Sequence, residues 1–281
     1  MKIIKWITVS VFLFFWQNNI YAQTTTELVS KMINAINDFK TGKYVIDKIE
    51  RIGDHNNTSE MIVKVQASPF KAYSYCVKPI PGIEILYVSG WNNNNAYIKP
   101  NQFPYVNLSL NPFGSTLRKD EHHTIPDMGF SYLGNILSDN IVKRTEEFYS
   151  SLSSDNEAEW KGKSYYKLTI DVANFGYVNY KVLNGENIYY IGKKLHLSDY
   201  MILSYNHLSD FDDVSPGQVI KVPNSYAKKI ELYLDKDNYL PLVQIIYDEK
   251  GLFEQYEYNS FVLNPVISPE EFTPTYKDYK F

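Results

Sequence analysis

The sequence contains a single cysteine, Cys76, among its 281 residues. One cysteine cannot form a disulfide within the chain, so an exported form of this protein must rely on its apolar core for stability. Cys76 lies in residues 72–77, a stretch typical of a strand. Buried cysteines usually behave as small hydrophobic side chains, and we expect that role here rather than a reactive thiol.

Positive charge is also scarce. The chain has 28 Lys and Arg against 32 Asp and Glu, which gives a formal net charge of −4 at pH 7. A mildly acidic protein without a basic tract has no electrostatic attraction for nucleic acid. It also lacks the polybasic patch that holds some proteins at an anionic membrane. We therefore expect no nucleic-acid partner.

Long apolar runs are absent apart from residues 6–16, which follow Lys2 and Lys5 and precede the small residue Ala22. This run is too short to span a bilayer as a helix, and its flanks are those of a secretory signal peptide. We predict a signal peptide over residues 1–22. No cysteine follows the run, so lipid anchoring is not expected. The mature chain, with a net charge of −6, is expected to be exported and soluble in the periplasm or cell envelope, with no transmembrane anchor.

Aromatic residues, by contrast, are abundant, with 25 Tyr and 15 Phe. They alternate with Ile and Val in runs bounded by Asn, Gly and Pro, which is typical of antiparallel strands. No repeated helix separates the runs, as a parallel sheet would require. The sequence therefore predicts a mainly β (α+β) protein. The predicted strands are residues 44–52, 60–67, 71–77, 83–88, 96–99, 164–171, 227–234, 240–247 and 252–261.

Two segments interrupt this pattern and are predicted to be helices. Residues 24–39 place apolar side chains on one face, with Thr26 available to cap the helix, and residues 130–148 show the same periodicity. Their apolar faces must be buried, and the concave side of a large sheet can accommodate both. We expect a curved, incomplete antiparallel barrel packed on helices.

The most distinctive stretch is residues 180–223. Residues 180–182 alternate like a short strand, and residues 187–195 carry apolar side chains at the spacing of one helix face. Ser198 is a good N-cap for a second helix, and residues 218–222 alternate again. The predicted order is strand, helix, helix, strand. Strands would precede and follow this unit in the same sheet, so we predict an insertion into a hairpin of the larger domain.

This stretch resembles a LysM domain in its opening Tyr-x-Val-x-x-Gly, its central Asn206 and its closing Pro-Gly-Gln-x-Ile-x-Val-Pro. LysM domains bind peptidoglycan and other N-acetylglucosamine-containing glycans in a shallow groove between two loops. Where the family usually has Gly-Asp-Thr, this chain has Gly185-Glu186-Asn187. The resemblance therefore predicts the LysM fold more firmly than it predicts affinity for glycan. A LysM scaffold that no longer binds sugar is the alternative. The resemblance implies a groove formed by Gly185, Glu186, Asn187, Ile188, Asp210, Phe211, Asp212 and Val214.

The rest of the mature chain, residues 23–179 with 224–281, resembles the LolA-like lipoprotein carriers and, more narrowly, the DUF1571 family of exported bacterial proteins. The resemblance rests on residues 111–114, Arg118, residues 121–130 and the closing sheet through Tyr258. LolA-like proteins hold acyl chains between a half-barrel and its helices, so a lipid or lipoprotein partner is implied. The sequence leaves open whether this cavity is empty or filled by the chain's own Tyr and Phe.

Residues 121–127 contain a possible functional cluster of Glu121, His122, His123 and Asp127. A metal or acid–base site needs such groups to converge on one point. Adjacent histidines on an extended segment point to opposite faces and would not easily share an ion. No metal-binding spacing accompanies the pair, so we expect no metal, no cofactor and no catalytic residue. We expect instead that one histidine is buried and hydrogen-bonded.

The sequence therefore favours a non-enzymatic cell-envelope protein. It would bind glycan through residues 180–223 and an apolar ligand in the half-barrel. Two alternatives remain open: an envelope hydrolase or metal-dependent enzyme using His122, His123 and Asp127, and a purely structural interaction protein.

Overall fold

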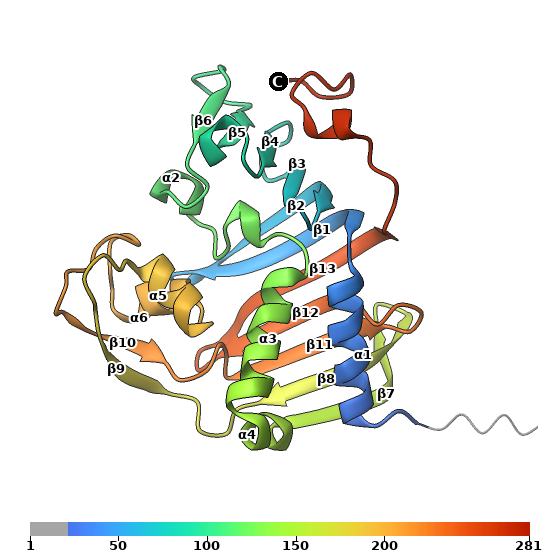
Figure 1. Cartoon of the computed structure of the whole chain (residues 1–281), viewed down its shortest axis with the longest axis vertical. Coiled ribbons are helices and arrows are strands. Elements are labelled where there is room, and N and C mark those ends of the chain that lie inside the picture. Colours follow the sequence, from blue (N-terminus) through green and yellow to red (C-terminus); the bar gives the residue numbers. More distant parts are fainter. Residues whose placement is uncertain (1–21) are drawn as a thin grey trace, which may run out of the picture.

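A computed structural model describes residues 22–281 (Figure 1). The predicted signal peptide lies almost wholly outside these residues. In the described part of the chain, no helix has the length and apolar character needed to cross a membrane.

The main feature is one curved antiparallel sheet of 11 strands (Figure 1). Its strand order is β6-β5-β4-β3-β2-β1-β13-β12-β11-β8-β7. The expected mainly-β half-barrel is confirmed, and every predicted strand is present. The sequence missed β6 and β7. The strands are β1 (Thr41–Ile52), β2 (His55–Gln66), β3 (Lys71–Lys78), β4 (Glu84–Val88), β5 (Ala96–Lys99), β6 (Leu108–Leu110), β7 (Leu152–Trp160), β8 (Lys163–Asp171), β11 (Lys229–Asp235), β12 (Pro241–Asp248) and β13 (Gly251–Leu263).

Two helices lie across one face of this sheet, α1 (Thr25–Asp38) and α3 (Ser131–Lys143) (Figure 1). The cap of α1 is Thr24, not Thr26 as predicted. Thr24 and Glu27 form a reciprocal capping box, which satisfies two backbone N–H groups at once.

The second predicted helix is broken at Arg144, whose φ and ψ of −137° and 43° are not helical. The chain resumes as α4 (Thr145–Ser150). Thr145 Oγ1 donates to the carbonyl oxygen of Ile141 at 2.6 Å. Such back-bonding by threonine competes with the helical pattern and bends helices. This accounts for the break in residues 130–148.

The two long helices fill one end of the half-barrel. Leu28, Met32 and Ile36 of α1 are buried together with Leu137 of α3. The helices approach closely at Gly134, where an added Cβ would lie 2.7 Å from Cγ2 of Ile36. The end of the half-barrel under α1 and α3 is therefore filled by side chains. Other segments cover the opposite end, near β1–β5.

Those segments are the short helices α2 (Ser115–Arg118) and η2 (Ile125–Asp127), which lie between β6 and α3. A turn, η1 (Asn92–Asn94), connects β4 to β5. The C-terminal residues, with η3 (Pro269–Phe272), pack against β3 and β4, where Tyr279 stacks on Tyr73 at 3.7 Å.

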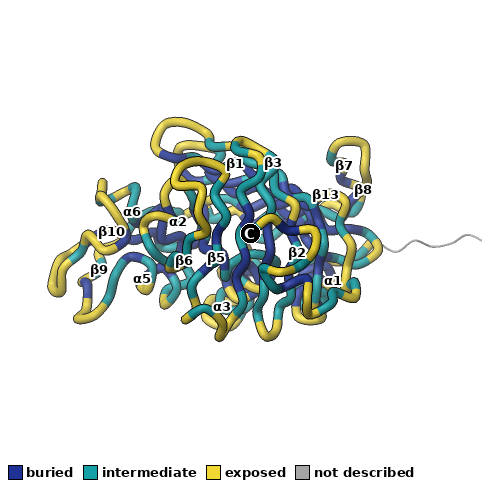
Figure 2. The backbone as a smooth tube through the Cα atoms, turned by 90° about the horizontal axis from the view of Figure 1, so that it is seen from above, coloured by how far each residue is buried: buried dark blue, intermediate teal, exposed yellow. Residues whose placement is uncertain are grey.

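Residues 177–223 form the predicted strand–helix–helix–strand unit. Its strands β9 (Tyr177–Lys181) and β10 (Val219–Pro223) pair with each other, and between them lie α5 (Ile188–Leu195) and α6 (Asp199–Tyr205). The unit is inserted between β8 and β11, which themselves pair antiparallel. Its outer loops are exposed, as Figure 2 shows.

Candidate functional site

A cavity of about 390 Å³ lies between the sheet, where β1, β2, β4, β5 and β11–β13 line it, and the segment that carries α2, η2 and α3. Its volume is within the range of about 300–1,000 Å³ that is usual for small-molecule sites. The half-barrel is therefore filled at the α1 end and open at the other. The apolar wall includes Met61, Ile83, Ile85, Ile98, Leu110, Leu117, Ile125 and Met128.

The floor of the cavity is set by the alternation of β1. Tyr44, Ile46, Lys48 and Glu50 are successive inward-facing residues, and all four line the cavity. The first two extend the apolar wall, and the last two place charges inside the sheet. Neither Lys48 nor Glu50 was among the site residues predicted from the sequence. Their inward positions in an alternating strand were the signal that could have found them.

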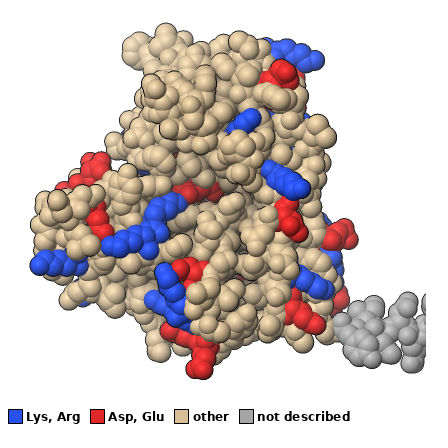
Figure 3. Space-filling model, in the orientation of Figure 1, with Lys and Arg blue, Asp and Glu red and all other residues tan. Residues whose placement is uncertain are grey.

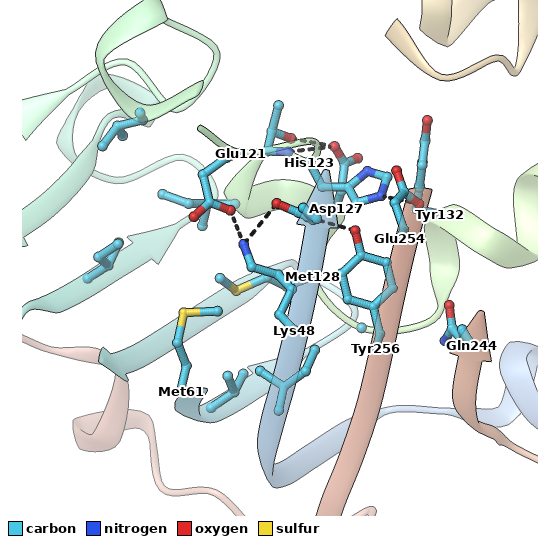
Figure 4. A pocket seen from close by; sticks show the side chains of 18 of the residues that line it. Lys48, Met61, Glu121, His123, Asp127, Met128, Tyr132, Gln244, Glu254 and Tyr256 are labelled. Atoms are coloured by element: carbon cyan, nitrogen blue, oxygen red, sulfur yellow. Dashed lines mark hydrogen bonds and ion pairs between the residues drawn. The ribbon is translucent and has the colours of Figure 1, made fainter. Parts of the chain in front are cut away.

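Lys48 and Glu50 belong to an ion-paired network at one end of the cavity. Figure 4 shows Lys48 beside Glu121 in this network. The Lys48 ammonium contacts the carboxylate of Glu121 and lies 3.3 Å from that of Glu50. Glu50 also accepts from the Tyr256 hydroxyl at 2.6 Å and from the His122 backbone N–H at 3.1 Å.

The pKa values within this network move in opposite directions. Burial alone would lower the pKa of Lys48, but the neighbouring Glu121 and Glu50 raise it. Burial alone would raise the pKa of Glu50, but Lys48 and the histidines lower it. For Glu121, burial outweighs the attraction of Lys48, and its pKa is raised. The surroundings of Glu50 thus favour its charged form, whereas those of Glu121 favour its neutral form.

The two histidines converge, contrary to the expectation that they would point to opposite faces. His122 Nδ1 lies 2.9 Å from one carboxylate oxygen of Glu254, and His123 Nε2 lies 3.4 Å from the other. The chain is not a strand at this point, so side chains need not alternate between two faces. His122 is the buried member, and its Nε2 lies 2.9 Å from the carbonyl oxygen of Arg51.

This arrangement gives Glu254 and His123 mutually shifted pKa values. Burial favours the neutral form of both groups. Nevertheless, His123 and His122 lower the pKa of Glu254, and Glu254 raises the pKa of His123. Glu254, from β13, is 132 residues from His122 and was not among the predicted site residues.

Asp127 belongs to a third network. It accepts from the backbone N–H and hydroxyl of Thr124 at 3.1 and 2.6 Å and pairs with Lys193 of α5. Burial would raise the pKa of Asp127, but Lys193 and His123 lower it. The predicted cluster thus divides among three partners: Lys48, Glu254 and Lys193. Within residues 22–281, no group of three His, Cys, Asp or Glu side chains has an arrangement that could hold a metal ion.

The inserted unit packs directly on the segment that covers the cavity. Arg118 of α2 is fully buried and donates two hydrogen bonds, of 2.9 and 3.0 Å, to the carboxylate of Asp199 in α6. Its guanidinium also lies 3.9 Å from the ring centre of Phe211. Tyr200 stacks on His122 at 4.1 Å. The unit therefore supports the covering segment from outside, because none of its residues lines the cavity. Figure 3 shows acidic side chains near the centre of this face of the molecule.

The two loops of the predicted glycan groove face each other. The Ile188 N–H donates to the Phe211 carbonyl oxygen at 2.8 Å, and the Asn187 amide donates to Asp212 at 2.8 Å. Glu186 is bound to the Tyr180 hydroxyl and to Lys194.

The eight predicted groove residues differ in exposure. Gly185, Asp210 and Asp212 are exposed, and Glu186, Asn187 and Val214 are partly buried. Ile188 and Phe211 are buried. These two residues join the loops to each other through the bond from the Ile188 N–H to the Phe211 carbonyl oxygen, and they offer no side chain to a ligand.

Comparisons with known proteins identify two families in the chain. Residues 39–177 match the model of a protein family of unknown function, DUF1571, and residues 180–223 match the LysM domain. Among curated proteins, none matches this sequence.

Several solved structures are similar to the chain. In the MucA/MucB complex of Pseudomonas aeruginosa, the match has 11% identity and a TM-score of 0.42 and covers 89% of this chain and 60% of that chain. The lipoprotein LppX of Mycobacterium tuberculosis matches with 12% identity and a TM-score of 0.41, over 85% of this chain and 95% of that one. A LolA superfamily protein of Nitrosomonas europaea matches with 11% identity and a TM-score of 0.34, over 90% and 98%.

Proposed function

We propose that this chain, in which residues 39–177 match the DUF1571 model and residues 180–223 match the LysM domain, is a binding protein of the bacterial cell envelope. Its LysM domain would bind peptidoglycan or a related glycan, and its half-barrel would bind a lipid or the acyl chain of a lipoprotein. The protein would be exported and soluble, and it would not be an enzyme.

The observation that carries the proposal is the open apolar cavity of about 390 Å³. An unfilled apolar volume destabilises a folded protein because packing contacts are lost, so we expect a purely structural protein to have a filled core. The cavity also has one polar end, which suits a ligand with an apolar chain and a polar head. A small-molecule site typically combines an apolar lining with a few polar groups in this way.

The competing enzymatic hypothesis depends on His122, His123 and Asp127 acting together. Both ring nitrogens of His122 already lie within hydrogen-bonding distance of Glu254 and Arg51, and Asp127 is paired with Lys193. These separate attachments favour binding over catalysis. Stoichiometric metal in the purified protein, lost in His122→Ala, would instead favour the enzyme.

Filling the cavity tests lipid binding. Ile85 lines the cavity, whereas Ile62 is 43% exposed and does not line it. We expect Ile85→Trp to abolish the capture of lipid detected by native mass spectrometry, and Ile62→Trp, the same substitution outside the cavity, to leave it unchanged. Equal lipid capture by both variants would contradict the proposal for the half-barrel.

Glycan binding is tested separately by co-sedimentation with purified peptidoglycan sacculi. Asp212→Ala removes the partner of Asn187 across the two loops, so we expect weaker binding. Asp237→Ala, at an exposed turn of the main domain, makes the same change of charge and serves as the control. Point variants are preferable to deletion of the LysM domain, because deletion would leave Arg118 without Asp199. Wild-type protein that does not sediment with sacculi would refute the glycan proposal.

A further inference from the structure

We infer that the ligand of the half-barrel is an acidic amphiphile, whose carboxylate or phosphate head binds Lys48 in place of Glu121. This inference rests on the proposed function and adds the chemical class of the head. Lys48 rises from β1 at the polar end of an otherwise largely apolar cavity (Figure 4).

The two carboxylates on Lys48 are not equivalent. The Glu50 side chain is 1% exposed and has further partners in Tyr256 and the His122 backbone. The Glu121 side chain is 36% exposed, and within residues 22–281 its carboxylate has a hydrogen bond to Lys48 alone. Glu50 is therefore held in place by several partners, whereas a ligand can displace Glu121 by replacing it on Lys48.

The difference between Glu50 and Glu121 favours an anionic head over a cationic one. An anionic head can replace Glu121 on Lys48, and the displaced carboxylate returns to water at low cost because it is already partly exposed. A cationic head would have to draw Glu121 away from Lys48, whose side chain is only 8% exposed. Leaving a buried ammonium short of a partner is costly. A second cationic group, His123, also lines the cavity and would repel a cation when protonated.

The remaining acidic groups do not offer an alternative site for a cation. Glu254 is bound by His122 and His123, and Asp127 is paired with Lys193.

The test is the affinity of the full chain for four amphiphiles with the same alkyl chain, measured by calorimetry below their micelle concentrations. The probes are dodecanoate, dodecyl phosphate, dodecanol and dodecylammonium. The variant Glu121→Gln removes the competing carboxylate. Asp120→Asn is the control, because it removes the neighbouring exposed charge and asparagine tolerates the φ of 61° found there.

We expect Glu121→Gln to bind an acidic probe about tenfold more tightly than wild type, since one competing charge-assisted hydrogen bond is gone. Its affinity for dodecanol should not change, and Asp120→Asn should behave as wild type. Comparison of dodecanoate with dodecyl phosphate then distinguishes a fatty acid from a phosphorylated lipid as the source of the head.

Equal tightening for dodecanol, or tighter binding of dodecylammonium, would overturn the inference and leave the proposed function intact. Failure of all four probes to bind wild type would instead overturn the proposed lipid function, and the inference with it. Lys48→Gln, checked for folding by circular dichroism, should lose the preference for acidic probes over dodecanol. A folded Lys48→Gln that kept this preference would also overturn the inference.

Discussion

The contact between Arg118 and Asp199 joins the LysM domain to the cover of the cavity, and its removal should destabilise the whole protein. The Arg118 side chain is 0% exposed and that of Asp199 is 10% exposed, with two hydrogen bonds of 2.9 and 3.0 Å between them. Arg118→Met would leave the Asp199 carboxylate buried without its cation. Breaking a buried pair from one side typically costs about 3–5 kcal/mol.

The measurement is urea-induced unfolding followed by circular dichroism. Arg118→Met should lower the free energy of unfolding by about 3–5 kcal/mol, while Lys181→Met, at an exposed position of β9, should change it by less than about 0.5 kcal/mol. The double variant with Asp199→Leu should be less destabilised than the sum of the two single variants by at least about 1 kcal/mol, because the orphaned charge is gone. Equal effects of Arg118→Met and Lys181→Met would refute the reasoning. So would wild-type protein that unfolds in two separate transitions, since the LysM domain would then be fastened only through its chain ends.

Two further predictions concern charge and capping. The raised pKa of His123 contributes stability that is complete below its unfolded pKa of about 6.5 and is lost as pH rises through the folded value. Between about pH 6 and pH 8, the urea midpoint of wild type and of His207→Gln should therefore fall more than that of His123→Gln; a parallel fall in all three would contradict the pairing with Glu254. Thr24→Ala should lower the free energy of unfolding by about 1 kcal/mol through loss of the α1 cap. Thr26→Ala should lower it far less, and equal losses would contradict the assignment of the cap to Thr24.

Much of the fold could be predicted because local patterns and burial agree. The alternation of β1 and the apolar face of α1 are visible in the sequence, since each element buries one side. The strand β7 was missed because its residues are mostly polar and only Ala158 is buried. The break at Arg144 was missed because it depends on a single hydroxyl of Thr145.

The site was less predictable because its partners are distant in sequence. Glu121 and the histidines were identified, but Glu254 is supplied by a strand 132 residues later. Arg118 and Asp199 are 81 residues apart and lie in different domains. A single sequence contains no local signal for such pairs. The inward charges of β1 are different, since the period of the strand places Lys48 and Glu50 beside Tyr44 and Ile46.

The insertion of the LysM domain between β8 and β11 has a consequence for the order of folding. Asp171 pairs with Lys229, so residues 172–228 form a long loop whose closure costs chain entropy. Tyr177 pairs with Pro223 inside that loop. Once the LysM domain has formed, only residues 172–176 and 224–228 remain to be closed. The loop that remains is shorter by about two and a half doublings, which saves roughly 1.5 kcal/mol of closure entropy. Early formation of the LysM domain would therefore bring the two halves of the main sheet together.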